Sequence, residues 1–198
     1  DGQHRLYGFA DSHKKATETV PVVAFNERND ISFEAKVFMD INENQKAVDS
    51  NLRWDLYEDL YINSNDGPER DLYTISKIAK CLNDSGPFMN QIELPKKSTK
   101  RHLTLNYVCS AIKRANLVGN HGPFRKPTKE ETIEYATNRI NIYFNVIKEF
   151  LPKRWELKQE HFINSNAGMY LFLTLLKDFI PKLFSEPVYN SPKKFKDE

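Results

Sequence analysis

The sequence predicts an α+β protein that is predominantly α-helical, and two observations support this fold class. Apolar residues recur every three or four positions through most of the chain, which is typical of amphipathic helices. β-Branched residues are concentrated in one short run, residues 19–25, which favours a strand. Of the 198 residues, 39% are hydrophobic and 12% aromatic, enough for the core of one domain, or of one domain with a helical extension.

The first expected element is a short helix at residues 2–16. The strand at residues 19–25 is expected to begin at a sheet edge, because Pro21 lacks the N–H that a central strand donates. Apolar residues at helical spacing predict the next helix at residues 31–41. After a polar stretch, four apolar residues recur every four positions and predict the buried stripe of another helix: Val48, Leu52, Leu56 and Leu60.

Four more helices are expected in the rest of the chain. Pro68 suits the first turn of a helix that Gly86–Pro87 ends, and a short strand is expected within residues 88–94. Thr128 and Glu131 have the spacing of a capping box. The residues expected to face the core are Leu72, Ile75, Ile78 and Leu82, then Leu105, Val108, Ile112 and Ala115, then Ile133, Ala136, Ile140, Phe144 and Ile147, and in a last helix at 166–180 Leu171, Leu175 and Phe179.

The composition limits the functional classes. The net charge of +2 does not by itself demand a nucleic acid or a membrane as partner. Cys81 and Cys109 are expected to be buried free thiols, and the histidines lack metal-ligand spacing, so no metal site is expected. No apolar run approaches the roughly 18 residues that span a bilayer. We therefore expect a cytoplasmic protein with no membrane partner.

The most informative feature is the opening run Asp1-Gly2-Gln3-His4-Arg5. Gly2 lets the backbone approach a ligand closely, and His4 and Arg5 add hydrogen-bond donors at the start of the predicted helix. Free N–H groups and the positive end of the helix dipole also lie there, so the run has the elements of an anion site. The alternative is that these residues form only a turn and a solvated first helical turn.

This run matches the DGQHR signature, and the chain resembles the DGQHR-domain proteins, which include DndB-type proteins of bacterial DNA phosphorothioation systems. The signature also looks like the nucleotide-binding box of the ParB/sulfiredoxin superfamily. The resemblance implies a ParB/sulfiredoxin-like nucleotide-binding part at residues 1–64. A helical region at residues 65–198 would follow, as a second part or as part of the same domain. In the family the motif follows a strand, so we expect a fragment whose first strands are missing. Residues 96–102 and 162–168 fit the family more loosely.

The resemblance implies a role for each residue of the motif. Gly2 and the N–H groups after it would cradle nucleotide phosphates, which His4 and Arg5 would neutralise. Sulfiredoxin has its catalytic cysteine where this chain has Gln3, so sulfinic-acid reductase chemistry is not supported. Asp1 would be the catalytic residue, either holding Mg²⁺ through water or orienting an attacking water.

A second segment, residues 37–48, resembles the family pattern F-x-x-I-N-x-x-Q-K-x-V. In ParB-like proteins an Asn-containing helix faces the nucleotide at this place. Asn42 and Gln45 are three residues apart and are expected to project toward the ligand from one helix face or its lead-in turn, and Lys46 to reach a phosphate. The alternative is that Asn42 or Asn44 caps the helix that follows.

A basic cluster precedes the helix that contains Leu105. With the basic pair Lys113 and Arg114 at the far end of that helix, the cluster could contact DNA phosphates, although such runs are also typical of solvated loops. Its members are Lys96, Lys97, Lys100 and Arg101.

Two functional hypotheses follow from the motif and its resemblance. The first is an NTP-binding and NTP-hydrolysing protein of a bacterial DNA-modification or phage-defence system, which uses Mg²⁺ with ATP or another NTP. Its partners would be the nucleotide, DNA and other proteins of the same system. The second is a DndB-like, non-enzymatic, DNA-binding transcriptional regulator.

Overall fold

The computed structural model describes residues 2–17, 19, 31–43, 48–95, 100–157 and 162–183. Within these ranges the chain is mainly helical with one small parallel sheet, which confirms the predicted fold class. The chain divides into two units, Asp1–Asp30 and Ile31–Glu198. Each unit is therefore described by itself, and the predicted division at residue 64 stays a prediction.

The described part of the first unit consists of helix α1, Gly2–Ala10, followed by turns at residues 11–17. The helix begins where the sequence predicts and ends six residues before the predicted end at residue 16. Turn hydrogen bonds, such as the one from the N–H of Asp11 to the carbonyl of Tyr7 at 3.3 Å, continue from its last turn. The predicted strand at residues 19–25 lies outside the described residues apart from Thr19.

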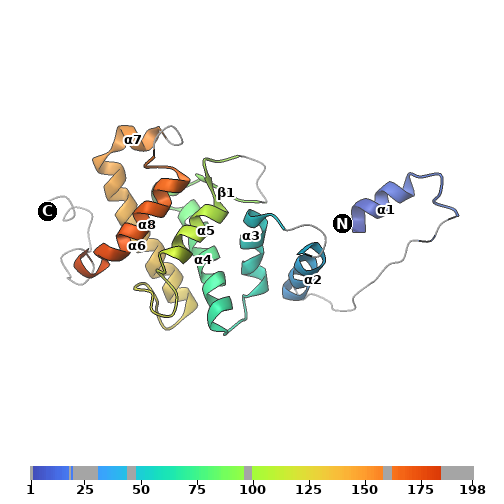
Figure 1. Cartoon of the computed structure of the whole chain (residues 1–198), viewed down its shortest axis with the longest axis horizontal. Helices are drawn as coiled ribbons and strands as arrows, with labels where there is room; N and C mark the ends of the chain where they lie inside the picture. The colour runs from blue at the N-terminus through green and yellow to red at the C-terminus, as the bar shows by residue number, and fades with distance from the viewer. Residues whose placement is uncertain are drawn as a thin grey trace. The chain divides into compact units, whose positions relative to one another are not determined.

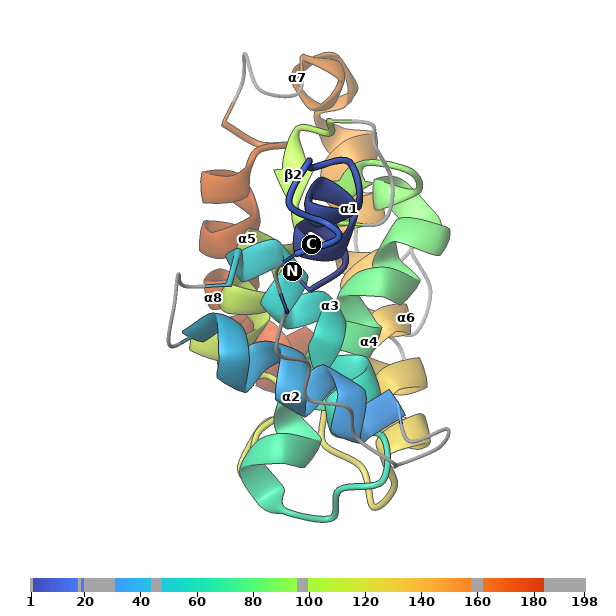
Figure 2. The same ribbon diagram turned by 90° about the vertical axis from the view of Figure 1, so that its right-hand side faces the viewer.

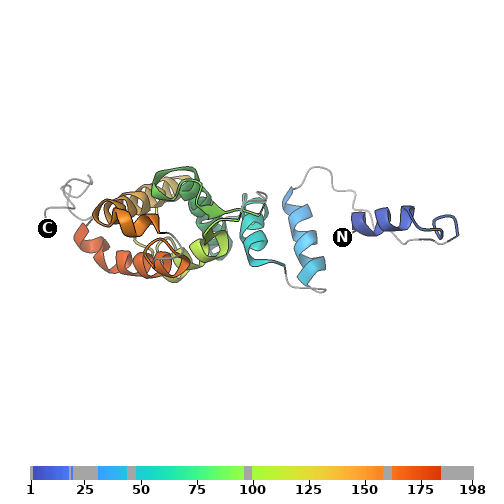
Figure 3. The ribbon, with the colours of Figure 1, turned by 90° about the horizontal axis from the view of Figure 1, so that it is seen from above.

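The second unit contains seven α-helices and one two-stranded sheet among its described residues. Figure 1 shows helices α4, α5, α6 and α8 packed beside one another, and Figure 2 shows α5 lying between α8 and α3. Helix α3 packs on α4 and α5, and α2 packs on α3, as Figures 1 and 3 show. The elements are α2 (Ile31–Glu43), α3 (Ser50–Leu60), α4 (Gly67–Asp84), the 3₁₀ turn η1 (Gly86–Phe88), β1 (Ile92–Glu93), β2 (Leu103–Thr104), α5 (Leu105–Arg114), α6 (Lys129–Phe150), α7 (Pro152–Glu156) and α8 (Asn166–Leu183).

Local signals place the helix ends. Pro68 lies in the first turn of α4 as predicted, and Gly86 adopts a φ of 75° just after that helix ends. The predicted capping box at the start of α6 is confirmed, because the Thr128 side chain accepts from the Glu131 N–H and the Glu131 carboxylate accepts from the Thr128 N–H, both at 3.1 Å. Thr104 caps α5 in the same way through the N–H of Tyr107.

The core lies where α4, α5, α6 and α8 meet. The predicted inward faces of α4, α5 and α6 are confirmed, except that Leu72, Ile133 and Ile147 are only half-buried against the core. An aromatic cluster of Phe88, Phe144 and Trp155 joins η1, α6 and α7, with ring centroids 4.7–6.2 Å apart. The largest fully buried side chains are Phe88, Phe124, Phe144, Ile78, Leu82, Leu103, Leu105, Ile112, Leu117, Ile140, Met169 and Leu173.

Two predicted faces are wrong. In α8, Leu171 and Phe179 are 42% and 43% exposed and Leu175 is half-buried, because this helix packs on α5 through a different stripe: Met169, Leu173 and Leu176. In α3, Trp54 and Asp55 are the buried residues. The predicted stripe beyond Val48 is only half-buried: Leu52, Leu56 and Leu60.

The short sheet depends on two buried asparagines. The Asn83 side chain accepts from the N–H of Ile92 at 2.9 Å and thereby fixes the start of β1, which pairs with β2 in parallel. The Asn164 side chain, only 2% exposed, donates to Gln91 Oε1 at 2.9 Å and to the Trp155 carbonyl at 3.3 Å. Its Oδ1 lies 3.0 Å from His102 Nε2. Since an amide oxygen can only accept, His102 is the donor in this last bond.

Removing the Asn164 amide should therefore loosen the whole sheet end of the second unit. Asn164→Ala leaves buried polar partners without a hydrogen bond, and we expect the free energy of unfolding to fall by roughly 2–4 kcal/mol in chemical denaturation. The matched control is Asn138→Ala, since Asn138 is an exposed asparagine on α6 and should change stability little. Equal effects of the two substitutions would contradict this role.

Candidate functional site

The opening motif forms the first turn of α1. Gly2, Gln3, His4 and Arg5 are all helical; the structure describes their backbone, and Asp1 lies outside the described residues. The first four N–H groups of an α-helix have no acceptor within the helix, and the positive end of the helix dipole lies beside them. Every helix N-terminus has these groups, so the predicted anion site at α1 stays a prediction.

The second predicted segment lies at the end of α2. Asn42 is in the last turn of this helix, with only its backbone described, and Gln45 and Lys46 lie outside the described residues. The alternative N-cap role of Asn42 or Asn44 is wrong, because α3 begins at Ser50 with Asp49 as its cap. The Asp49 carboxylate accepts from the N–H groups of the next turn at 2.9 and 3.2 Å. The two halves of the predicted phosphate site lie in different units, and their meeting stays a prediction.

The basic residues form two pairs at opposite ends of α5. Lys100 and Arg101 are exposed just before β2, and Lys113 and Arg114 are exposed in the last turn of the helix. The ten residues of α5 separate the pairs by roughly 15 Å. Lys96 and Lys97, the other members of the predicted DNA-contacting cluster, lie outside the described residues.

α5 has a polar, aromatic face, of which the sequence singled out only the basic pair Lys113 and Arg114. Its members have the spacing of residues on one side of a helix: Asn106, Tyr107, Ser110, Lys113 and Arg114. Part of this face borders a groove of about 520 Å³ between α5 and the start of α8. Arg114 lies over the Tyr170 ring, 5.6 Å from its centroid. The helical spacing of the apolar residues of α5 is the signal that could have found this face, because Tyr107 falls on the polar side of a strongly amphipathic helix.

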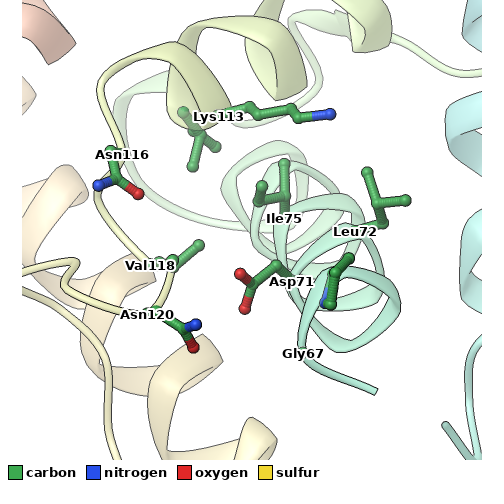
Figure 4. Close-up of a pocket in the computed structure, with 11 residues that line it drawn as sticks. Gly67, Asp71, Leu72, Ile75, Lys113, Asn116, Val118 and Asn120 are labelled. Carbon is green, nitrogen blue, oxygen red and sulfur yellow. The ribbon is translucent and has the colours of Figure 1, made fainter. Parts of the chain in front are cut away.

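A second hollow, of about 360 Å³, lies between the start of α4 and the loop after α5 (Figure 4). Asp71 is its only carboxylate, and the carboxylate and the side chain of Asn120 point toward each other in Figure 4. Arg125 pairs with Asp71 at 2.8 Å and neutralises this acid, so the hollow offers amides and the cation of Lys113, which also lines it. Asn116, with a φ of 51°, shapes the loop that closes it.

The strongest ionic cluster is structural and links α3 to α4. Lys80 Nζ lies 2.7 Å from Asp55 Oδ1 and 2.6 Å from Glu58 Oε2, and Lys77 Nζ lies 2.6 Å from Glu58 Oε1. Burial alone would raise the pKa of Glu58, but hydrogen bonds from Lys77 and Lys80 outweigh it and leave the pKa below 4.5. Burial would lower the pKa of Lys80, but hydrogen bonds to Asp55 and Glu58 raise it. The cluster holds a half-buried carboxylate ionised.

Burial keeps both cysteines and one tyrosine in their protonated forms at neutral pH. Cys109 is buried and free as predicted, and burial raises its thiol pKa well above the ordinary value. Cys81 is free and half-buried rather than buried, and burial raises its pKa too. Burial also raises the pKa of Tyr143 to about 12. Within the described ranges, no three His, Cys, Asp or Glu side chains lie close enough to hold a metal ion. No described helix is long and apolar enough to span a membrane.

The ionic cluster makes stability depend on pH in acid. Since the pKa of Glu58 is lower in the folded state, its stabilisation is fully present above the ordinary pKa of 4.5 and is lost as the pH falls through the folded-state pKa. Glu58→Gln should therefore lower the free energy of unfolding near neutral pH, and its difference from wild type should shrink below about pH 4. Chemical denaturation at several pH values measures both the loss of stability near neutral pH and its decrease in acid. Glu134→Gln, at an exposed position on α6, is the control; a difference for Glu58→Gln that stays constant through acid would contradict the assignment.

Comparison with known proteins supplies the family. A family model described as DndB, DNA-sulfur modification-associated, matches residues 1–180. No curated protein and no solved structure matches the chain. The matched range runs from the opening motif into the last turns of α8, and so includes the groove between α5 and α8. The chain belongs to the DndB family of DNA-sulfur modification-associated proteins.

Proposed function

We propose that the chain is an NTP-binding and NTP-hydrolysing protein of a bacterial DNA-sulfur-modification or phage-defence system, with the start of α1 holding the nucleotide phosphates. The observation that carries the proposal is the backbone of Gly2, Gln3, His4 and Arg5, which forms the first turn of a nine-residue helix. Phosphate binds at such turns because unpaired N–H groups and the helix dipole both favour an anion. Family membership supports a role beside DNA.

Each residue of the motif has a distinct role in this proposal. Gly2 leaves room for a phosphate oxygen to approach the first N–H groups, since a Cβ is missing there. His4 and Arg5 supply positive charge, and Gln3 supplies an amide donor. Mg²⁺ bound with the nucleotide would neutralise further phosphate charge, and Asp1 would hold that ion through water or orient the attacking water.

The second half of the site is proposed from the end of α2. Asn42 lies one residue before the C-terminus of this helix, so a ligand bound by Asn42 would lie at the helix end. Asn42 and Gln45 would donate and accept hydrogen bonds at the base or ribose, and Lys46 would reach a phosphate. This half rests on the family-like pattern of residues 37–48.

Arg5→Ala tests the phosphate site directly. A nucleotide at 100 times its Kd stabilises a folded protein by about 2.7 kcal/mol, so wild type should melt at a higher temperature with Mg²⁺ and the right NTP. Arg5→Ala should weaken binding about tenfold or more, because a charge-assisted hydrogen bond to phosphate is lost. Arg154→Ala, at an exposed arginine on α7, should leave the thermal shift unchanged. Identical shifts for wild type and Arg5→Ala with every NTP would refute the site.

The second candidate function, a non-enzymatic DNA-binding regulator, is favoured by the basic pairs that flank α5. Four exposed cations about 15 Å apart in two pairs match the electrostatic needs of a phosphate backbone. If Lys100 and Arg101 contact duplex phosphates, replacing both by Ala should reduce the slope of log Kd against log salt concentration by about 2. Gel-shift titrations at several salt concentrations measure this slope. Absence of duplex binding even at low salt would exclude the regulator.

A further inference from the structure

The groove between α5 and α8 combines aromatic rings, a cation and oriented polar groups. Tyr107 and Tyr170 both line it, and they are 53% and 42% exposed. Exposed tyrosines bordering one groove are the surfaces on which nucleobases stack, because every base has a π-face. Arg114 is the only ionised side chain among the residues that line it, so the groove is electropositive.

Asn106 has a fixed orientation at the edge of this groove. Its Oδ1 accepts from the Trp54 indole N–H at 3.2 Å and from the Ser110 hydroxyl at 3.4 Å. The amide nitrogen must therefore occupy the other position, and among the described residues no acceptor is bound to it. The Ser110 hydroxyl donates its proton to Asn106, and its lone pairs can still accept a hydrogen bond. Asn106 and Ser110 thus offer a donor and an acceptor side by side, as a base edge requires.

The backbone at the start of α5 is already occupied and offers no anion site. The N–H of Asn106 donates to Asn51 Oδ1 at 2.7 Å, and the N–H of Tyr107 donates to the Thr104 hydroxyl at 3.4 Å. A phosphate beside this groove would therefore be neutralised by Arg114, with Lys113 next to it on the helix surface. The arginine is held by the Tyr170 ring and does not need to be ordered by the ligand.

The packing of α5 favours the binding of single-stranded DNA over duplex DNA in this groove. α5 packs against α3, α4 and α8, and four of its side chains border the groove between it and α8. A helix that reads duplex DNA must enter a major groove about 12 Å wide, which three helices packed around α5 oppose. An unpaired base, in contrast, is small enough to enter a groove of about 520 Å³.

We propose that this groove binds an unpaired nucleotide of a single DNA strand. The base lies against Tyr107 and Tyr170, its edge meets Asn106 and Ser110, and its phosphate pairs with Arg114. The proposal rests on the groove and on the family's association with DNA, and it is independent of the nucleotide site proposed for α1.

Fluorescence anisotropy with the full 198-residue chain tests it. The probe is a labelled 12-nucleotide DNA strand of mixed sequence, compared with the duplex of the same sequence and with ATP as competitor. Wild type should bind the single strand more tightly than the duplex. Tyr107→Ala should weaken binding about fivefold or more, whereas Tyr107→Phe keeps the stacking ring and should bind like wild type. Arg114→Ala should weaken binding and reduce the salt slope by about 0.7.

Two controls keep the test specific. Phe150→Ala removes an aromatic ring that is 55% exposed at the end of α6, and Arg154→Ala removes an exposed arginine on α7; neither should change strand binding. Tyr107 and Arg114 are exposed, so their variants should keep the thermal midpoint of wild type.

Four outcomes would overturn the proposal. These are no strand binding at low salt, duplex binding that is tighter than strand binding, equal strand binding by wild type and Tyr107→Ala, and loss of strand binding in Arg5→Ala, which would move the strand to α1. A fifth outcome would replace it: if ATP displaces the strand, and Tyr107→Ala also weakens ATP binding, the groove is a mononucleotide site instead. If Arg5→Ala loses the ATP thermal shift and keeps strand binding, both proposals stand. If ATP gives no shift at all and strand binding persists, the nucleotide proposal alone fails.

Discussion

The hydrogen bonds of the Asn164 side chain are the constraint on which the second unit most depends. One buried amide joins three segments that are far apart in the sequence: the turn before β1 through Gln91, the start of β2 through His102, and the end of α7 through the Trp155 carbonyl. No main-chain ladder could do this, because the sheet has only two residues in each strand. The amide supplies long-range order that so short a sheet lacks.

The segment around Asn164 also fixes the geometry of the candidate nucleic-acid groove. Two residues after Asn164, Asn166 begins α8, and its side chain accepts from the N–H of Thr104, the last residue of β2 and the cap of α5. The starts of α5 and α8 are thus fixed to each other through Thr104 and Asn166. Gly168 lets the first turn of α8 lie close to the segment before it, because a Cβ there would lie 2.1 Å from the Phe162 carbonyl oxygen. The groove between the two helices is therefore preorganised by the same few residues that stabilise the sheet.

The helices α4, α5 and α6 could be predicted from the sequence because their signals are local. Pro68, Gly86 and the Thr128–Glu131 box mark ends, and apolar residues at helical spacing mark faces. The face of α8 could not be predicted in the same way, because apolar residues surround this helix and only its packing on α5 selects Met169 and its neighbours.

The candidate sites also differ in whether the sequence could predict them. The opening motif is contiguous, so both its content and its helical setting were visible in the sequence, and the structure confirms the helix. The groove is built from α5 and α8, whose facing residues Tyr107 and Tyr170 are more than sixty positions apart, so no spacing rule brings them together. Asn106 is likewise oriented by Trp54, a partner 52 residues away. Such sites follow from tertiary packing and not from a motif.

The most direct measurement of the central claim, that an unpaired DNA nucleotide occupies this groove, is photo-crosslinking with a strand that contains 5-iododeoxyuridine. Irradiation joins this base to an aromatic ring stacked on it, and mass spectrometry of the digested complex identifies the residue. If the base lies in the groove, adducts should form on Tyr107 or Tyr170, from α5 and α8. Adducts confined to α1, or to exposed aromatic residues away from the groove such as Phe150, would contradict it.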